Sequence, residues 1–255
     1  MPIEFAVVPC LSDNYAALIH DGDSGATAVV DAPDAGAILA ALAERGWVLS
    51  DILVTHHHFD HVEGVAELVR RTGARVTGAR ADAGRIAGLD VLVGDGDVIE
   101  VGGLRLEVLE TPGHTVGHIA YVAREPAAVF CGDTLFAMGC GRLFEGTPAQ
   151  MWASLGRLAA LAPETAVYCG HEYTQSNGRF ALRVDPANAA LTERMAEVDR
   201  LRAAGLPTVP STMARELATN PFLRAGDPGI AAGLGMAGAA PVAVFAELRE
   251  RKNKG

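Results

Sequence analysis

Short apolar runs, bounded by Gly, Pro, Asp or Asn, recur through the N-terminal part of the chain. Runs of this length between turn-forming residues are typical of buried β-strands. The pattern predicts strands over residues 3–8, 15–19, 26–31, 51–55, 104–109, 118–123, 127–131 and 166–169.

Other segments repeat apolar residues every three or four positions, which is the spacing of an amphipathic helix. They predict helices over residues 35–45, 62–71 and 148–160. Strands and helices are mixed, and several neighbouring strands are close enough along the chain to form hairpins. This mixture favours a sheet-rich α+β core over a simple alternation of strand and helix.

The pattern changes after Tyr173. Strand-like runs become scarce, and helical spacing is found over residues 182–204, 211–218 and 241–252. We therefore divide the chain into residues 1–173, which hold the sheet-rich core, and residues 174–255, which form a small helical domain. A chain of 255 residues is long enough to bury a substantial core in this way.

Charge is spread unevenly between these two parts. The net charge is −10, with 10 basic and 23 acidic side chains in residues 1–173 and 11 basic and 8 acidic ones in residues 174–255. A negative protein is a poor match to nucleic acid, so we expect no nucleic-acid partner. The mildly basic helical part is suited to a small anionic substrate.

The sequence shows no signal for export or membrane insertion. Its start, Met-Pro-Ile-Glu-Phe, lacks the basic and apolar stretches of a signal peptide, and no apolar run approaches the ~18 residues of a spanning helix. The four cysteines, at positions 10, 131, 140 and 169, form no close pair and no zinc-ribbon spacing. We expect a cytoplasmic protein with reduced thiols and no membrane partner.

Candidate chemistry is concentrated in the run Thr-His-His-His-Phe-Asp-His at positions 55–61, directly after an apolar stretch. Imidazole and carboxylate are the ligands that borderline divalent cations such as zinc prefer. In an extended chain, His56 and His58 project to one side and His57 to the other. The Asp and the last His of the run then turn the chain and offer a second ligand pair. One segment can therefore begin two neighbouring metal sites.

Nearly all of the remaining histidines lie in two other short segments. These are Thr-Pro-Gly-His-Thr-Val-Gly-His at 111–118 and Cys-Gly-His-Glu-Tyr at 169–173, with Phe-Cys-Gly-Asp-Thr at 130–134 between them; only His20 lies elsewhere. Each segment follows a strand signal and contains Gly or Pro, as expected of loops at strand ends. Residues on such loops are disproportionately functional.

Taken together and in this order, the segments resemble the metallo-β-lactamase superfamily. More narrowly, they resemble the glyoxalase II (hydroxyacylglutathione hydrolase) family. Two further segments favour that family: Gly-Cys-Gly-Arg-Leu-Phe-Glu-Gly at 139–146 and Asn-Pro-Phe-Leu-Arg at 220–224. The resemblance implies the αβ/βα sandwich of the superfamily, an α+β fold, followed by a C-terminal α-helical domain that binds substrate.

The resemblance also implies two divalent metal ions per chain. Zinc is expected, with iron or manganese as alternatives, because all three accept His and carboxylate ligands. Carried over by motif, the ligands of the first metal are His56, His58 and His114. Those of the second metal are Asp60, His61 and His171, and the carboxylate that bridges both is Asp133.

The activity implied by the family is thioester hydrolysis. S-(2-hydroxyacyl)glutathione, typically S-D-lactoylglutathione, is cleaved to glutathione and D-lactate by a metal-bridging hydroxide, in the second step of methylglyoxal detoxification. Asp60 and Asp133 are the expected catalytic carboxylates. A leaving thiol with a pKa near ~8.5 needs no dedicated general acid. No Ser-His-Asp or Cys-His arrangement competes with this scheme.

Substrate contacts also follow from the resemblance. The positions that match the family near glutathione are Arg142, Phe144, Tyr173, Arg249 and Lys252. Glutathione carries carboxylates, and an Arg side chain can bind a carboxylate through two hydrogen bonds. Tyrosine is frequent in the family where this chain has Phe144, so one hydroxyl contact is missing. We expect a monomer that acts on a small glutathione thioester.

Other functions fit the sequence less well. The nearest alternative is an iron-dependent glutathione persulfide dioxygenase of the same superfold, but the helical C-terminal part with Arg249 and Lys252 favours the hydrolase. A lactamase is disfavoured by the bridging role of Asp133 and by the missing export signal. Seven matching ligand positions disfavour a binding or scaffolding protein without activity.

Three polar residues near the ligands have structural interpretations. His57 faces away from its neighbours, which indicates an orienting or exposed role. His118 begins a strand, where we expect a structural hydrogen bond. Asp31 either caps a turn or orients a ligand histidine, and the sequence leaves both open.

Overall fold

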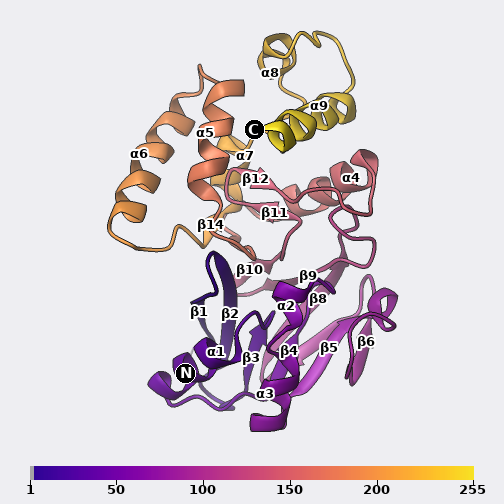
Figure 1. Ribbon diagram of the computed structural model, residues 1–255, viewed down its shortest axis with the longest axis vertical. Coiled ribbons are helices and arrows are strands. Elements are labelled where there is room, and N and C mark those ends of the chain that lie inside the picture. The colour runs from indigo at the N-terminus through magenta and orange to yellow at the C-terminus, as the bar shows by residue number, and fades with distance from the viewer. Residues whose placement is uncertain (1–2) are drawn as a thin grey trace. The chain divides into compact units, whose positions relative to one another are not determined.

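The computed structural model describes residues 3–255, and Figure 1 labels its elements. The chain divides into two compact units, each described here by itself. Unit 1 comprises Met1–Thr111 and Val116–Gly132, and unit 2 comprises Pro112–Thr115 and Asp133–Gly255. The loop 112–115 therefore belongs to unit 2, although both of its neighbours in sequence lie in unit 1. The domain division at residue 173 stays a prediction.

A six-stranded sheet forms one layer of unit 1 (Figure 1). Its strands, in spatial and sequence order, are β1 (Ile3–Cys10), β2 (Asn14–Asp21), β3 (Thr27–Val30), β4 (Asp51–Leu53), β5 (Arg75–Ala79) and β6 (Val91–Val93). The first three strands pair antiparallel, and β3 to β6 pair parallel. Strands β2, β3 and β4 are buried throughout, as expected of apolar runs at the centre of a covered sheet.

A second group of strands in unit 1 is antiparallel. It contains β7 (Val98–Val101), β8 (Leu104–Glu110), β9 (Ile119–Arg124) and β10 (Ala127–Phe130), paired in that order. The buried Tyr121 of β9 donates its hydroxyl to the Val54 carbonyl at 2.9 Å, directly after β4. Phe5 of β1 meets Phe130 of β10 edge to face, with ring centroids 5.5 Å apart. The two strand groups therefore pack against each other within unit 1.

The helices of unit 1 are α1 (Ala35–Arg45), α2 (Phe59–Val62) and α3 (Val65–Thr72), with the 3₁₀ turn η1 (Arg80–Asp82). Asp34 caps α1 by accepting hydrogen bonds from two backbone N–H groups, and Gly46 ends it in the left-handed conformation. Buried residues of α1 and α3, including Ile38, Leu42 and Leu68, share a core with β1 to β5. These helices cover the outer face of the six-stranded sheet and leave its loops free to carry ligands.

Unit 2 is mostly helical. Its strands are β11 (Leu135–Phe136), β12 (Gly139–Cys140), β13 (Ala166–Tyr168) and β14 (Ser211–Thr212). Its helices are α4 (Pro148–Ala159), α5 (Thr174–Val184), α6 (Ala189–Ala203), α7 (Met213–Thr219), α8 (Pro228–Gly233) and α9 (Pro241–Lys254). Helix α4 begins with a capping box between Thr147 and Gln150 and has Pro148 in its first turn.

A buried polar network fixes the β11–β12 hairpin in unit 2. Asn220 donates its side-chain amide to the carbonyls of Phe136 and Gly139, at 3.2 and 2.9 Å. Glu216, which is fully buried, accepts the Met138 backbone N–H at 2.8 Å and is paired with Arg194. The Asn-Pro-Phe-Leu-Arg segment noted in the sequence thus holds the hairpin in place, because its first residue binds both hairpin strands.

Several predicted boundaries are wrong, for identifiable reasons. The predicted helix 62–71 corresponds to α3, which begins at Val65, and the short helix α2 before it was not predicted. The predicted helix 182–204 is interrupted at residues 185–188 between α5 and α6, because Pro186 disfavours helical geometry at the residue before it. The segment 211–218 begins with the short strand β14. Strands β5 to β7, the two short hairpin strands, β14 and helix α8 were not predicted.

In the described residues, no helix is both long and apolar enough to cross a membrane.

Candidate metal centre and substrate cavity

The ligand run of unit 1 begins at the end of β4. Its first histidine, His56, is fully buried, as is His61. Asp31, which directly follows β3, lies beside this run and has a positive φ of 59°. One ligand atom from each of Asp31, His56 and His61 lies within 4.8 Å of the other two.

Asp31 determines which ring nitrogens of these histidines are available. Its Oδ2 lies 2.8 Å from Nδ1 of His61 and accepts the Thr55 hydroxyl at 2.9 Å. Its Oδ1 accepts the Thr55 backbone N–H at 2.8 Å. Because the Thr55 hydroxyl donates its proton to Asp31, its oxygen accepts a hydrogen bond from Nδ1 of His56, 3.0 Å away. Both rings then carry their proton on Nδ1 and present the Nε2 lone pair to a metal.

The other predicted ligands of unit 1 lie close by. Nε2 of His56 is 3.1 Å from Nδ1 of His58, so the two rings converge from one side as alternation predicted. Oδ2 of Asp60 lies 3.8 Å from Nε2 of His61 and accepts the Asn14 amide at 3.1 Å. Asn14 also donates to the Asp60 carbonyl at 3.1 Å and thereby fixes the start of α2.

The two histidines set aside as structural make other contacts. Nδ1 of His57 lies 3.2 Å from the carboxylate of Asp82, which is fully buried. His118 is also fully buried, and its Nδ1 lies 2.9 Å from the Thr111 hydroxyl. The hydrogen bond expected for His118 is therefore present. The η1 turn thus holds His57 through Asp82, and the His57 ring meets that of His58 edge to face, with centroids 5.1 Å apart.

Unit 2 holds the remaining predicted ligands. Nε2 of His114 and Nε2 of His171 each lie 3.4 Å from Oδ2 of Asp133. All three side chains are buried. Gly141 makes this packing possible, because a Cβ at that position would lie 2.0 Å from the Asp133 carbonyl and 3.0 Å from Nδ1 of His114.

The chemistry of this second set fits a divalent metal. Nδ1 of His114 donates to the Arg142 carbonyl at 2.8 Å, so in the neutral ring the Nε2 lone pair faces the Asp133 carboxylate. A lone pair and a carboxylate oxygen repel each other unless a cation lies between them. Two imidazoles converging on one carboxylate oxygen are typical of ligands around a bound cation. The chain thus has a His/Asp cluster suited to a divalent metal. Four of the seven predicted ligands lie in unit 1, and three lie in unit 2.

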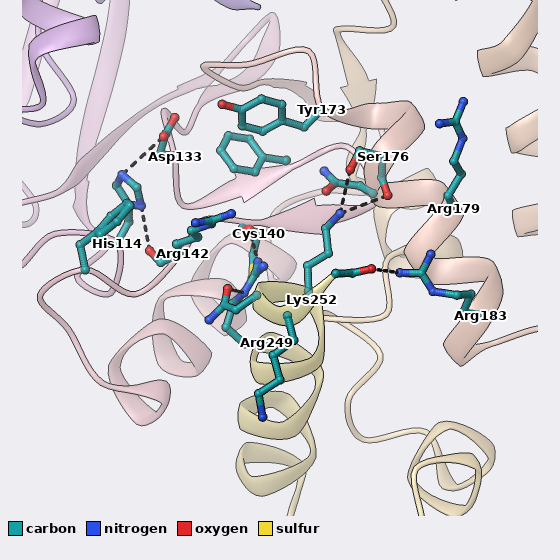
Figure 2. A pocket seen from close by; sticks show the side chains of 16 residues that line it. His114, Asp133, Cys140, Arg142, Tyr173, Ser176, Arg179, Arg183, Arg249 and Lys252 are labelled. Carbon is teal, nitrogen blue, oxygen red and sulfur yellow. Dashed lines mark hydrogen bonds and ion pairs between the residues drawn. The ribbon is translucent and has the colours of Figure 1, made fainter.

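A cavity of about 790 Å³ opens in unit 2, and His114 and Asp133 form part of its wall (Figure 2). All five residues predicted to contact substrate line it. The other lining residues are Phe136, Cys140, Ser176, Asn177, Arg179, Arg183, Asn253, Lys254 and Gly255. Asp133 is the one acidic side chain among the residues lining the cavity, against six Arg and Lys side chains. The cavity is therefore suited to an anionic ligand.

Arg249 and Lys252 reach the cavity from α9. The guanidinium of Arg249 is buried, donates to the Cys140 carbonyl at 2.8 Å and lies 5.1 Å from the ring centre of Phe222. Lys252 donates to the hydroxyl and carbonyl of Ser176, at 2.9 and 3.1 Å. Burial, followed by repulsion from Arg249 and the neighbouring arginines, lowers the pKa of Lys252 to about 8. Its charge can therefore change within a range accessible to enzyme assays.

Aromatic side chains connect the cavity to the ligands of unit 2. Tyr173 stacks on the ring of His171, with centroids 4.7 Å apart and planes 5° apart. Phe144 meets His114 edge to face at 5.2 Å and is 63% exposed. These two residues form an apolar stretch of wall between the ligand pair and the cations.

Nine residues that line the cavity were not predicted from the sequence, and three of them lie on α5. Ser176, Arg179 and Arg183 have the spacing of one helix face. That spacing was the available signal, but the predicted helix began only at residue 182. Ser176 and Arg179 therefore lay outside any predicted element.

Comparison with known proteins decides the family. Residues 13–171 match the metallo-beta-lactamase superfamily, and residues 172–255 match the hydroxyacylglutathione hydrolase C-terminus. The chain is 60% identical over 253 residues to a hydroxyacylglutathione hydrolase of Ruegeria pomeroyi, which covers 99% of both chains. This chain belongs to the hydroxyacylglutathione hydrolase family. The family and the fold predicted from the sequence, a metallo-β-lactamase domain with a helical C-terminal domain, are confirmed.

Solved structures show the same fold. ETHE1 from Myxococcus xanthus aligns with a TM-score of 0.71 and 28% identity, over 99% of this chain and 92% of that one. TTHA1623 in a di-iron-bound form aligns with a TM-score of 0.63 and 28% identity, over 86% of this chain and all of that one. Both identities are far below that to the hydroxyacylglutathione hydrolase. The dioxygenase alternative is not favoured, because the full-length relative at 60% identity is a hydroxyacylglutathione hydrolase.

Proposed function

We propose that this chain hydrolyses S-(2-hydroxyacyl)glutathione, typically S-D-lactoylglutathione, to glutathione and D-lactate, the second step of methylglyoxal detoxification. The observation that carries this proposal is the cavity of unit 2, which has the His114–Asp133 pair in its wall and an excess of cations. A glutathione thioester has a reactive carbonyl and carboxylates, so it matches both features. Full-length identity to a hydroxyacylglutathione hydrolase supports the same substrate.

The site takes two divalent ions in this proposal. As the family motifs imply, the first ion would be held by His56, His58 and His114, the second by Asp60, His61 and His171, and Asp133 would serve both. When bound, such ions polarise a carbonyl and acidify water near neutral pH. The Nε2 lone pairs that Asp31 and Thr55 leave available support the ligand roles in unit 1. Zinc suits these donors, and the di-iron form of TTHA1623 makes iron the first alternative to measure.

The protein's own side chains bind and orient the substrate. We assign Arg249 and Lys252 to a substrate carboxylate, which their position on the cavity wall supports. Phe144 and Tyr173 cover the part of the substrate that lies between that carboxylate and the reacting thioester carbon. Asp60 and Asp133 supply negative charge close to the reacting atoms. The thiol of glutathione leaves as a thiolate, since thiol pKa values lie near ~8.5.

The remaining assignments rest on the sequence together with these observations. Residues 1–173 form the catalytic domain and residues 174–255 the substrate-binding domain, which is consistent with the positions of Arg249 and Lys252. All four cysteines are free and buried, as suits a protein that acts as a cytoplasmic monomer in a reducing compartment.

The proposal is tested by thiol release from S-D-lactoylglutathione, with and without a strong chelator. Rapid release that the chelator abolishes is the expected result. Protein with metal bound that releases no thiol would reject the hydrolase. Oxygen consumption with glutathione persulfide, measured in parallel, would then test the dioxygenase alternative.

A further inference from the structure

Two arginines of the cavity lie outside the five residues predicted to contact the substrate. Arg179 and Arg183 extend from α5, on the same helix face as Ser176, which holds Lys252 (Figure 2). Both arginines are exposed. They add a second group of cations to a cavity that already contains Arg249 and Lys252.

This second group is not neutralised by acidic side chains. Arg183 donates to the main-chain oxygen of Gly255 at 2.8 Å, and its guanidinium lies 5.6 Å from the ring centre of Phe180. Within residues 3–255, Arg179 forms neither an ion pair nor a side-chain hydrogen bond. By contrast Lys254, also in the cavity wall, pairs with Glu250 at 2.9 Å. Arg179 therefore has its full donor capacity available to a ligand.

The spacing along α5 matches the size of a tripeptide. Arg179 and Arg183 lie three and seven residues after Ser176, which corresponds to roughly 4.5 and 10 Å along a helix with a rise of about 1.5 Å per residue. Three residues of extended peptide span at most about 10 Å. A glutathione moiety whose glycyl carboxylate is held by Lys252 at Ser176 can therefore reach Arg179 with its other end.

We propose that Arg179, supported by Arg183, forms a second anion site that binds the γ-glutamyl carboxylate of the glutathione thioester. The inference rests on the proposed function, because it extends the same cavity. A guanidinium can take a carboxylate through two parallel hydrogen bonds. The α-ammonium group beside that carboxylate stays hydrated, because Arg179 is exposed at the rim. The site thus selects thioesters of thiols that carry a carboxylate at each end.

Substrates with and without the γ-glutamyl group test this site. Arg179→Gln removes the charge without breaking a contact within the described chain. With S-D-lactoylglutathione, we expect its KM to rise about fivefold while kcat changes less than twofold. With the S-D-lactoyl thioester of cysteinylglycine, wild type and variant should have the same KM. Arg200→Gln, on the exposed surface of α6, is the matched control and should behave as wild type with both substrates.

Two kinetic results would overturn the proposed anion site. One is an unchanged KM of Arg179→Gln for the glutathione thioester. The other is an equal loss with both substrates, because the arginine would then act on a group common to both. Calorimetric binding of S-methylglutathione and S-methylcysteinylglycine repeats the comparison without catalysis. Calorimetry distinguishes failure of the anion site from failure of the proposed hydrolase activity, because a thioether can bind in the cavity but cannot be hydrolysed. Equal affinity of wild type and Arg179→Gln for S-methylglutathione, or no measurable binding by wild type, would also reject the proposal.

Discussion

The two sets of predicted metal ligands are held in place by different contacts. In unit 1, Asp31 reaches His61 directly and His56 through Thr55, by buried side-chain hydrogen bonds. In unit 2, His114 is held by a backbone carbonyl and His171 by an aromatic ring. The unit 1 set therefore depends on one carboxylate that is remote in sequence, whereas the unit 2 set depends on the cavity wall itself.

This difference separates two tasks. In unit 1, hydrogen bonds place the ring proton of His56 and of His61 on Nδ1, and none of the described residues of this unit lines the 790 Å³ cavity. Unit 2 contributes ligands and the substrate cavity together. Substitutions in unit 1 should therefore change metal affinity with little effect on KM. Substitutions in the cavity wall should mainly change substrate binding.

Asp133→Ala should have the largest effect, because this carboxylate is assigned to both ions. We expect loss of metal from both sites and a fall in kcat/KM of more than the ~100-fold seen when residues that support ligands are removed. Metal content by mass spectrometry and thiol release are the readouts. Asp199→Ala, an exposed carboxylate on α6, is the control. Full metal occupancy in Asp133→Ala would reject the bridging role.

Asp31→Asn should weaken metal binding by about 10- to 100-fold, since an amide has one acceptor oxygen, whereas Asp31 uses one oxygen for the Thr55 N–H and the other for the Thr55 hydroxyl and the His61 ring. Asn tolerates the positive φ of this residue, so the fold should persist. Competition with a chromophoric chelator measures the affinity. Asp34→Asn keeps an equally good helix cap and should leave the affinity unchanged. Equal affinity of Asp31→Asn and wild type would show that Asp31 does not orient the ligands.

Lys252 should make kcat/KM depend on pH. Because its pKa is lowered to about 8, the side chain loses its charge as pH rises through that value. Attraction for a substrate carboxylate is then lost, so kcat/KM should fall about fivefold between pH 7 and pH 9. Lys252→Arg keeps its charge over this range, and its profile should be flatter. Identical profiles for the two proteins would remove Lys252 from the binding site.

His57→Ala should have the smallest effect on function. The ring contacts Asp82 and meets the His58 ring only edge to face, at 5.1 Å between centroids, and it is not among the predicted ligands. Both ions should therefore stay bound, and kcat/KM should change less than about twofold. Loss of the contact to a buried carboxylate should lower the stability by ~1 kcal/mol, seen as a lower Tm. Release of either ion from this variant would show that His57 is a ligand.

The sequence was most informative where chemistry is local. His56 and His58 converge as two-residue alternation predicts, because the chain between them is extended. The contact between Asp31 and His61 joins residues 30 positions apart, so local spacing could not choose between a turn cap and an orienting group. The structure resolves that choice in favour of orientation.

Elements were missed where the local pattern was weak. Strand β5 begins with an exposed Arg75 and contains Gly78, and β7 is largely exposed, so neither shows a continuous apolar run. Helix α5 is rich in polar residues around Asn177, and its true beginning was therefore overlooked. That error concealed the cavity face formed by Arg179 and Arg183.

Metal titration tests the central claim most directly. Protein stripped with a chelator is titrated with zinc, and thiol release from S-D-lactoylglutathione is measured alongside the bound metal per chain. The two ligand sets predict two ions per chain and no further gain in rate beyond two equivalents. Full activity with one ion bound, or with none, would contradict the assignment of two catalytic ions to these ligands.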